Sequence, residues 1–210
     1  APTRTRMGAK IRRCVRAREG HTLVMIDFDQ IEMRMLGSVA RDEAMIKAFR
    51  DPGDFFCNLA AQLFNEPNFK KSDPRRQLVK NGGYAKIYGA GVAKFAKTAG
   101  IDEVSAKAFL DAFDAAFPGV RRMQREVETL ATQRRIAEGV SYVRCPLTNR
   151  KHIADPGREY ALVNYMIQGA AAVVLKRKMI ELDAAGVGEW LVLPVHDEII
   201  ADVPTDRVTE

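Results

Sequence analysis

The stretch Thr22-Leu-Val-Met-Ile-Asp27 is a short apolar run that ends in an acid, and this pattern is typical of a buried β-strand. Two further strand-like runs, Trp190–Val195 and Glu198–Val203, stand near the other end of the chain and flank His196-Asp197. Strand signals at both ends with helical patterns between them predict an α+β fold, in which an antiparallel sheet is interrupted by an α-helical insertion.

The middle of the chain is predicted to be helical because its apolar residues recur three and four positions apart. Asp42 is the expected cap between the first two of these helices. Strand signals return between Gly139 and Ile153, and the long helix that follows has a weak point at Gly169. The predicted helices cover Gln30–Phe49 (two helices), Phe55–Leu63, Arg75–Tyr88, Ser105–Phe117, Val120–Ile136 and Glu159–Ala185.

Length and composition exclude several classes of protein. The chain has 210 residues, of which 47% are hydrophobic and 29% charged, as expected of a globular protein of one or two domains. No apolar run reaches the roughly 18 residues of a membrane helix, and no signal peptide is recognisable. Three scattered cysteines without a CxxC pair predict neither a zinc site nor a disulfide framework, and favour a reducing cytosol. The net charge of +6 weakly favours an anionic partner.

Two aspartates stand at the ends of apolar runs. Asp27 closes the first strand, and Asp197 lies in the tight turn between the last two, next to Glu198. Carboxylates at strand ends suit hard cations, and two of them could hold a pair of Mg²⁺ ions about 4 Å apart for phosphoryl transfer. Each acid alone is equally compatible with a role as a helix cap or turn former.

A second candidate site lies on the predicted helix Arg75–Tyr88. Arg76, Lys80, Tyr84 and Tyr88 are spaced four apart, so they lie within about 120° on one face. Two cations and two aromatic rings on one face suit a nucleoside triphosphate. The alternatives are a solvated amphipathic face, or a hairpin turn at Asn81-Gly82, because two glycines within a helix are tolerable only where something approaches the backbone closely.

The motifs together resemble those of the family A DNA polymerases, the group of bacterial DNA polymerase I and its phage relatives. Asp27–Arg34 resembles motif A, the Arg76-to-Gly89 face resembles motif B, and Val195–Glu198 resembles motif C. They occur in the family's order and at about its spacing. Phe117–Val120 and the pattern Asn164…Gln168-Gly169 also match, so the resemblance covers nearly the whole chain.

The resemblance implies DNA-directed DNA polymerase activity, in which dNTPs are added to a primer 3′-hydroxyl by a two-metal-ion mechanism. Asp27 and Asp197 would bind two Mg²⁺ ions, for which Mn²⁺ can substitute, and the Phe28 carbonyl would be a further ligand. Glu198 would be a supporting acid at the catalytic centre. The expected partners are primer–template DNA and dNTPs, with no membrane.

The resemblance also implies binding residues. Arg76 and Lys80 would clamp the triphosphate, and Tyr84 would stack near the sugar and base. Glu32 would exclude a ribose 2′-hydroxyl with Tyr88 as its hydrogen-bond partner. The remaining nucleotide-binding residue would be Gln30, and the DNA-binding residues would be His196, Asn164, Gln168 and Arg4.

Some positions depart from the family's usual residues. Asp29 stands where many members have Ser, and Phe56 where many have a His that contacts phosphate; the other departures are Gly82-Gly83, Ala85 and Tyr160. These put the strength of nucleotide binding in doubt more than the chemistry. Tyr84 in place of Phe goes with ready acceptance of dideoxynucleotides in this family, and the same is expected here.

The resemblance predicts palm in residues 1–36, helical fingers in 37–137 and a C-terminally truncated second palm part in 138–210. Thumb and exonuclease domains are not recognised in the chain, so the rest of the polymerase is expected in the same gene product or a separate chain. The alternatives are a catalytically incompetent DNA- or nucleotide-binding fragment, or another two-metal enzyme such as a nuclease, against which the triphosphate face argues. The expected location is a bacterial cytosol or nucleoid, or a phage-infected host.

Overall fold

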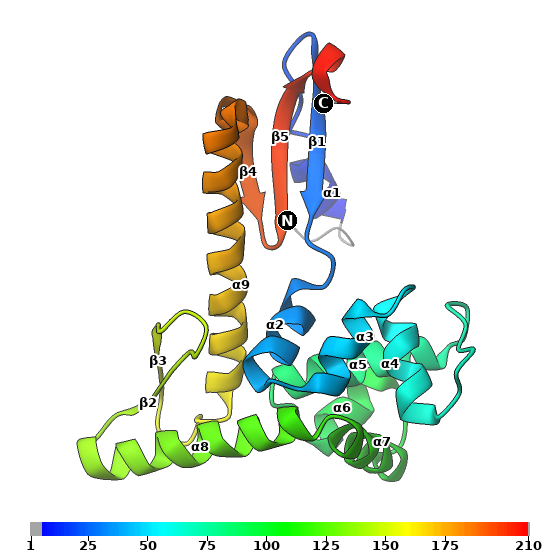
Figure 1. Cartoon of the computed structure of the whole chain (residues 1–210), viewed down its shortest axis with the longest axis vertical. Helices are drawn as coiled ribbons and strands as arrows, with labels where there is room; N and C mark the ends of the chain where they lie inside the picture. Colours follow the sequence, from blue (N-terminus) through cyan, green and yellow to red (C-terminus); the bar gives the residue numbers. More distant parts are fainter. Residues whose placement is uncertain (1–5, 210) are drawn as a thin grey trace. The chain divides into compact units, whose positions relative to one another are not determined.

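The structure is a computed structural model that describes residues 6–209. The chain divides into two compact units, one formed by the described residues up to Asp29 together with those from Val174 onward, and the other by Gln30–Val173. The fold is mixed α+β, mostly helical with small antiparallel sheets, which confirms the predicted class (Figure 1). Within the described residues, no helix is long and apolar enough to cross a membrane.

The first unit, called here the sheet unit, is built on a three-stranded antiparallel sheet in the order β1-β5-β4. All three strands were predicted, and Asp27 lies opposite Glu198 in the register between β1 and β5. The elements of this unit are α1 (Arg6–Arg12), β1 (His21–Asp27), the end of α9 (Ala161–Leu182), η1 (Asp183–Val187), η2 (Gly188–Trp190), β4 (Leu191–Val195), β5 (Glu198–Pro204) and η3 (Thr205–Arg207).

The prediction that the first strand is buried is wrong for the described residues. Met25 is 62% exposed and Ile26 43% exposed. Strand β1 lies at the edge of the sheet, where it pairs only with β5. The apolar side chains of β1 thus form a strand, as predicted, but several of them stay exposed within this unit.

The second unit, called here the helical unit, contains most of the helices. Helix α9 contributes its N-terminal part to this unit. The other elements are α2 (Ile31–Ala40), α3 (Glu43–Arg50), α4 (Phe55–Phe64), α5 (Arg75–Ile87), α6 (Val92–Ala99), α7 (Glu103–Ala116), α8 (Pro118–Glu138) and the hairpin β2 (Ser141–Arg144) with β3 (Lys151–Ala154).

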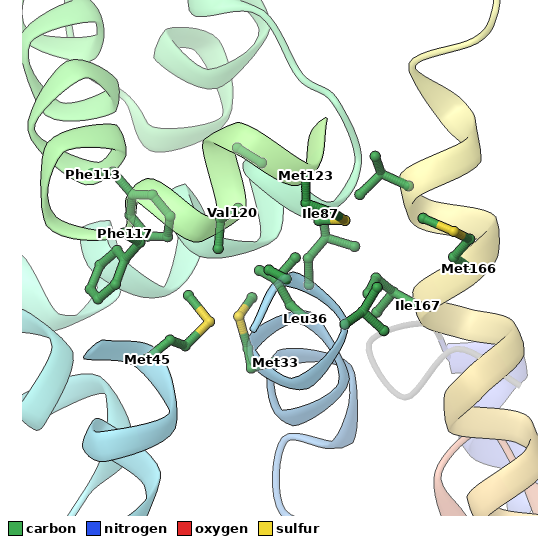
Figure 2. Close-up of a cluster of buried hydrophobic side chains, with 14 of the residues drawn as sticks. Met33, Leu36, Met45, Ile87, Phe113, Phe117, Val120, Met123, Met166 and Ile167 are labelled. Atoms are coloured by element: carbon green, nitrogen blue, oxygen red, sulfur yellow. The ribbon is translucent and has the colours of Figure 1, made fainter. Parts of the chain in front are cut away.

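One apolar core holds the helical unit together. Its buried side chains come from every helix from α2 to α9, and Figure 2 shows part of this cluster converging. Aromatic residues supply much of its volume: the ring of Phe113 lies 4.8 Å from that of Phe117 and 6.5 Å from that of Phe109. Burial of rings of this size is the main source of stability for such a unit.

Local sequence explains how α3 and α8 begin. Asp42 caps α3, as predicted, because its side chain accepts a hydrogen bond from the Met45 backbone N–H at 3.0 Å. The same buried carboxylate also accepts from the backbone N–H groups of Gly119, at 2.8 Å, and Val120, at 3.3 Å, in the first turn of α8. One side chain thus satisfies donors at the start of two helices that are far apart in the sequence.

The two glycines in α5 have a packing reason. A Cβ at Gly82 would lie 2.1 Å from the Phe109 ring, and one at Gly83 would lie 3.0 Å from the end of Met33. Both neighbours therefore approach the helix backbone closely. Helix α5 runs through Asn81-Gly82 without a break, so the hairpin alternative is wrong.

Two further details differ from the sequence prediction. Helix α6 was not expected, and it begins directly after the predicted helix stop at 89–91, where Gly89 has a φ of 61°. Helix α9 continues through Gly169 without weakening there. This glycine accommodates the His152 ring, whose Cε1 would lie 2.6 Å from an added Cβ.

Candidate functional site

The acidic residues predicted as metal ligands lie together at one end of the sheet unit. Asp27 is the last residue of β1 and is paired in register with Glu198, the first residue of β5. Asp197 lies in the turn just before β5, and its carbonyl accepts a hydrogen bond from the Phe28 N–H at 3.1 Å. Backbone pairing therefore holds the segments that carry Asp27 and Asp197 side by side.

The charges at this end of the sheet repel one another. Burial, followed by the charges of Asp197, Glu198 and Asp29, raises the pKa of Asp27 above its ordinary value. A carboxyl whose proton is retained by neighbouring carboxylates gains most from a nearby cation. Asp29, the departure from the family pattern, adds to this acidic cluster.

The donor set fits Mg²⁺. Within residues 6–209, no three His, Cys, Asp or Glu side chains gather into an all-protein metal cage. Mg²⁺ is usually held by one or two carboxylates together with substrate phosphates, so a pair of neighbouring aspartates suits it. The sheet end therefore suits a cation that a phosphate-bearing substrate would share.

His196 stands beside these acids in a strained conformation. It occupies the β4–β5 turn with a φ of 58°, a left-handed backbone conformation that residues other than glycine rarely adopt. The side chain is exposed. Such conformations are commonly found at functional sites, where the surrounding structure holds them in place.

The cationic face of α5 lies in the helical unit, and Arg76 there already has a partner. Its Nε donates to Asp54 Oδ1 at 2.8 Å and its Nη2 donates to Asp54 Oδ2 at 2.7 Å. The guanidinium also lies 5.5 Å from the centre of the Phe56 ring, and Lys80 Nζ lies 5.7 Å from it. Phe56, at the position where many family members have His, is buried beneath both cations.

Glu32, Tyr88 and Gln168 form a short chain of polar contacts in the same unit. The Tyr88 hydroxyl donates to Glu32 Oε2 at 3.4 Å, which confirms the expected contact, and accepts from Gln168 Nε2 at 3.5 Å. Burial and the Glu32 charge raise the pKa of Tyr88. Helices α2, α9 and the end of α5 thus meet at one hydroxyl group.

A cavity between α5 and α6 was missed because α6 was not predicted. Its volume is about 190 Å³, and Tyr84 and Tyr88 line it on the α5 side. The sequence carried a signal, since apolar residues of α6 recur at helical spacing. The full lining is Asn81, Tyr84, Ala85, Tyr88, Ala90, Lys94, Phe95 and Thr98.

Two other predicted site residues have buried acceptors with no hydrogen-bond partner among the described residues. These are the side-chain amide oxygens of Gln30 and Asn164. A buried acceptor without a partner costs about 1–3 kcal/mol, so such atoms are common where a ligand or water completes the site. Gln30 also has a left-handed backbone, with a φ of 55°.

The structure brings Asp27, Asp197 and Glu198 together in the sheet unit, and Glu32, Tyr88 and Gln168 together in the helical unit. Tyr160, another departure from the family pattern, packs against Gly89, where its ring would lie 2.9 Å from an added Cβ. Arg4, predicted to bind DNA, lies outside the described residues. Among the other N-terminal arginines, Arg18 is engaged within the sheet unit, where its Nε donates to Asp202 at 2.6 Å.

Comparisons with known proteins cover the whole chain. The profile of a family described as DNA polymerase family A matches residues 1–210. A DNA polymerase of Mycobacterium phage D29 is 34% identical over 197 residues, which are 94% of this chain and 31% of the phage protein. DNA polymerase I of Deinococcus radiodurans is 29% identical, with 100% of this chain and 22% of that protein covered.

A solved structure is also similar. It is described as the POL domain of Pol1 from M. smegmatis in complex with DNA primer-template and dNTP. The TM-score is 0.80 and the sequence identity 30%, over 97% of this chain and 37% of that chain. The chain thus spans well under half the length of each of these relatives.

Proposed function

The chain belongs to DNA polymerase family A, and from this premise we propose that it carries the active-site residues of a template-directed DNA polymerase. The reaction joins a dNTP to a primer 3′-hydroxyl and releases pyrophosphate. The observation that carries the proposal is the acidic end of the sheet, where Asp27 pairs in register with Glu198 beside Asp197. A phage and a bacterial DNA polymerase as relatives support a site of action in a bacterial cytosol or nucleoid, or in a phage-infected host.

In this proposal, Asp27, Asp197 and the Phe28 carbonyl hold two Mg²⁺ ions, with Mn²⁺ as a substitute, and Glu198 supports them. When bound, such ions activate the attacking hydroxyl and stabilise the leaving pyrophosphate. The two aspartates would hold the ions at a fixed place, because the β1–β5 pairing fixes the end of β1 that carries Asp27 and the turn before β5 that carries Asp197. His196, in its strained turn, would contact the primer terminus.

The helical unit would bind the nucleotide. Arg76 and Lys80 would contact the triphosphate, and Tyr84 would lie against the sugar and base. Glu32, held by the Tyr88 hydroxyl, would occupy the space that a ribose 2′-hydroxyl needs. The buried acceptor oxygen of Gln30 supports a contact with the nucleotide.

DNA contacts would come from Asn164 and Gln168 on α9, and from Arg4. The minor groove presents similarly placed acceptors in every base pair, so residues that contact it can test pair geometry without reading sequence. Residues 1–36 and 138–210 would form the palm and residues 37–137 the fingers. A thumb and an exonuclease domain would be supplied by the same gene product or a separate chain.

Primer extension by the full-length product of the gene that encodes this chain tests the proposal. We expect Asp27→Ala and Asp197→Ala each to reduce extension by about three orders of magnitude, because each removes a ligand of the reacting centre. Asp202→Ala, which alters a carboxylate near the other end of β5, is the matched control and should retain extension. Extension that survives both site substitutions would refute the proposal, and DNA binding without extension would favour an inactive fragment.

A further inference from the structure

The start of helix α4 contacts the cationic face of α5 through an ion pair between residues 22 positions apart. Asp54 receives two parallel hydrogen bonds from Arg76, at 2.8 and 2.7 Å. The pair is largely shielded from solvent, since the Arg76 and Asp54 side chains are only 21% and 16% exposed. Paired, shielded geometry of this kind is the strongest form of the Arg–carboxylate contact.

The geometry leaves part of the guanidinium available. An arginine carries five N–H donors, and Asp54 uses one on Nε and one on Nη2. Within residues 6–209, Asp54 is the carboxylate that Arg76 contacts, and the Cys57 side chain is a further neighbour of the guanidinium. Asp54 does not use the donors on Nη1 or the second donor on Nη2. These form the outer edge of the fork, which matches two oxygens of a phosphate.

Asp54 is itself fixed in place. Its Oδ1 accepts from the Cys57 backbone N–H at 3.0 Å, so the residue caps α4 while it holds Arg76. The Arg76 hydrogen bonds lower the pKa of Asp54 to about 2, so the carboxylate stays charged at neutral pH. The Nζ atom of the exposed Lys71 side chain lies 3.9 Å from Asp54 Oδ2.

Phe56 fixes the other side of the guanidinium. Its ring is 1% exposed and lies beneath both Arg76 and Lys80. A phenyl ring has no N–H or O–H group, so this face offers a ligand no hydrogen bond from Phe56. Lys80 lies over the same ring, and no ion pair with a carboxylate engages it within residues 6–209. Arg76 thus supplies direction while Lys80 supplies net positive charge.

We propose that Asp54 is a positioning residue that orients Arg76, so that the outer edge of its guanidinium binds the terminal phosphates of a nucleoside triphosphate. This inference rests on the proposed function, because it names the residue through which Arg76 would act. Asp54 would not touch the substrate. Its carboxylate would hold one edge of the fork on the capped start of α4 and leave the other edge to the ligand.

The first experiment measures binding of inorganic tripolyphosphate to the 210-residue chain by calorimetry at neutral pH and constant ionic strength. Asp54→Asn retains an oxygen that can cap α4 but loses the charged, paired contact with Arg76. We expect it to weaken binding about tenfold, the value of one charge-assisted hydrogen bond. In an Arg76→Ala background, the same substitution should have little further effect, because coupled residues do not act additively.

Two controls separate positioning from loss of the cap. Asp102→Asn alters the equivalent cap of α7, where Asp102 accepts from the Ser105 N–H at 2.8 Å, and should leave tripolyphosphate affinity unchanged. Asp54→Ser keeps a capping oxygen but cannot pair with arginine, and should weaken binding as Asp54→Asn does. Thermal unfolding of each variant confirms that it is folded before its affinity is compared.

Several results would overturn the inference. Unchanged or tighter binding by Asp54→Asn would show that Asp54 only neutralises Arg76, and an equal loss in the Arg76→Ala background would show that it acts by another route. Absence of tripolyphosphate binding to the unmodified chain would also reject it.

Primer extension by the full-length gene product supplies the separate test of the proposed function. There, Asp54→Asn should raise the KM for dNTP about tenfold and lower kcat much less, as loss of ground-state binding does. A gene product without extension, in a chain that binds tripolyphosphate through the Asp54–Arg76 pair, would reject the polymerase proposal and leave this inference standing.

Discussion

The two units of this chain differ in how they bury apolar residues. In the helical unit, side chains from every helix from α2 to α9 form one core with fully buried residues such as Phe113 and Met33 (Figure 2). In the sheet unit, Ile199, Ala201 and Val203 of β5 are buried, whereas Met25 on β1 and Val192 on β4 are 62% and 56% exposed.

This difference in burial means that the two units contribute differently to stability and to the proposed reaction. The acids proposed for catalysis stand on the sheet, whose own described residues bury little, while the cations proposed for the nucleotide stand on a helix backed by a dense core. The sheet unit has an open, mostly apolar pocket of about 340 Å³, and Leu23, Met25 and Ile200 are among the residues that line it. The core of the helical unit, in contrast, is closed. Backbone pairing rather than side-chain packing therefore positions the acids.

The largest expected effect on stability comes from comparing one core substitution in the helical unit with one strand substitution in the sheet unit. Phe113→Ala should destabilise the chain by about 3–5 kcal/mol, because it leaves a cavity in a core that is fully closed. Met25→Ala should cost less than about 1 kcal/mol, since its side chain is mostly exposed. Urea denaturation followed by circular dichroism measures both. Equal losses would break the comparison.

A second prediction concerns the buried carboxylate that joins α3 to α8. Asp42→Ala should cost about 2–3 kcal/mol, because it leaves backbone donors of Met45, Gly119 and Val120 without their acceptor in a buried place. Asp102→Ala removes an exposed cap and should cost only about 1 kcal/mol. The same denaturation measurement compares them, and a smaller loss for Asp42→Ala would show that its contacts with α8 contribute little.

A third prediction compares neighbouring glycines in α5. Gly82→Ala should destabilise by about 1–2 kcal/mol, because Phe109, packed against Phe95 and Phe113, cannot move away from the new methyl group. Gly83→Ala meets only the flexible end of Met33 and should be tolerated better. If thermal unfolding ranked the two variants in the opposite order, the core around Phe109 would be looser than the structure indicates.

The smallest expected effect is the change in the stability of the folded chain as the pH becomes acidic. Because Arg76 lowers the pKa of Asp54 to about 2 from an ordinary value of 3.8, this carboxylate stabilises the folded chain above pH 4 and loses that contribution as the pH falls toward 2. Asp54→Asn should flatten this part of the curve of unfolding temperature against pH. An unchanged curve would mean that other carboxylates dominate the acid response.

Much of the fold could be predicted because its signals are local. The cap at Asp42, the helical spacing from Arg75 to Tyr88 and the strand runs around His196-Asp197 all depend on residues close in sequence. Helix α6 was missed because it has only eight residues and follows a glycine-rich stop. The exposure of β1 could not be predicted, since an apolar strand looks the same whether or not another element covers it.

The candidate site divides in the same way. The order and spacing of the acidic and cationic motifs, and with them the family, are properties of the sequence by itself. The sequence also predicted the contact between Glu32 and Tyr88 through the resemblance. It did not predict that Gln168 shares the Tyr88 hydroxyl, because that contact joins residues 80 positions apart.

What the sequence by itself determined is which residues carry charge and which face of a helix or end of a strand they occupy, because periodicity and capping are local effects. Only the tertiary structure decided that Arg76 is held by Asp54 above a buried Phe56, and that Gly82 makes room for Phe109. Such contacts depend on which distant segments pack together, and that choice is made by burial of the whole core rather than by any one stretch of the chain.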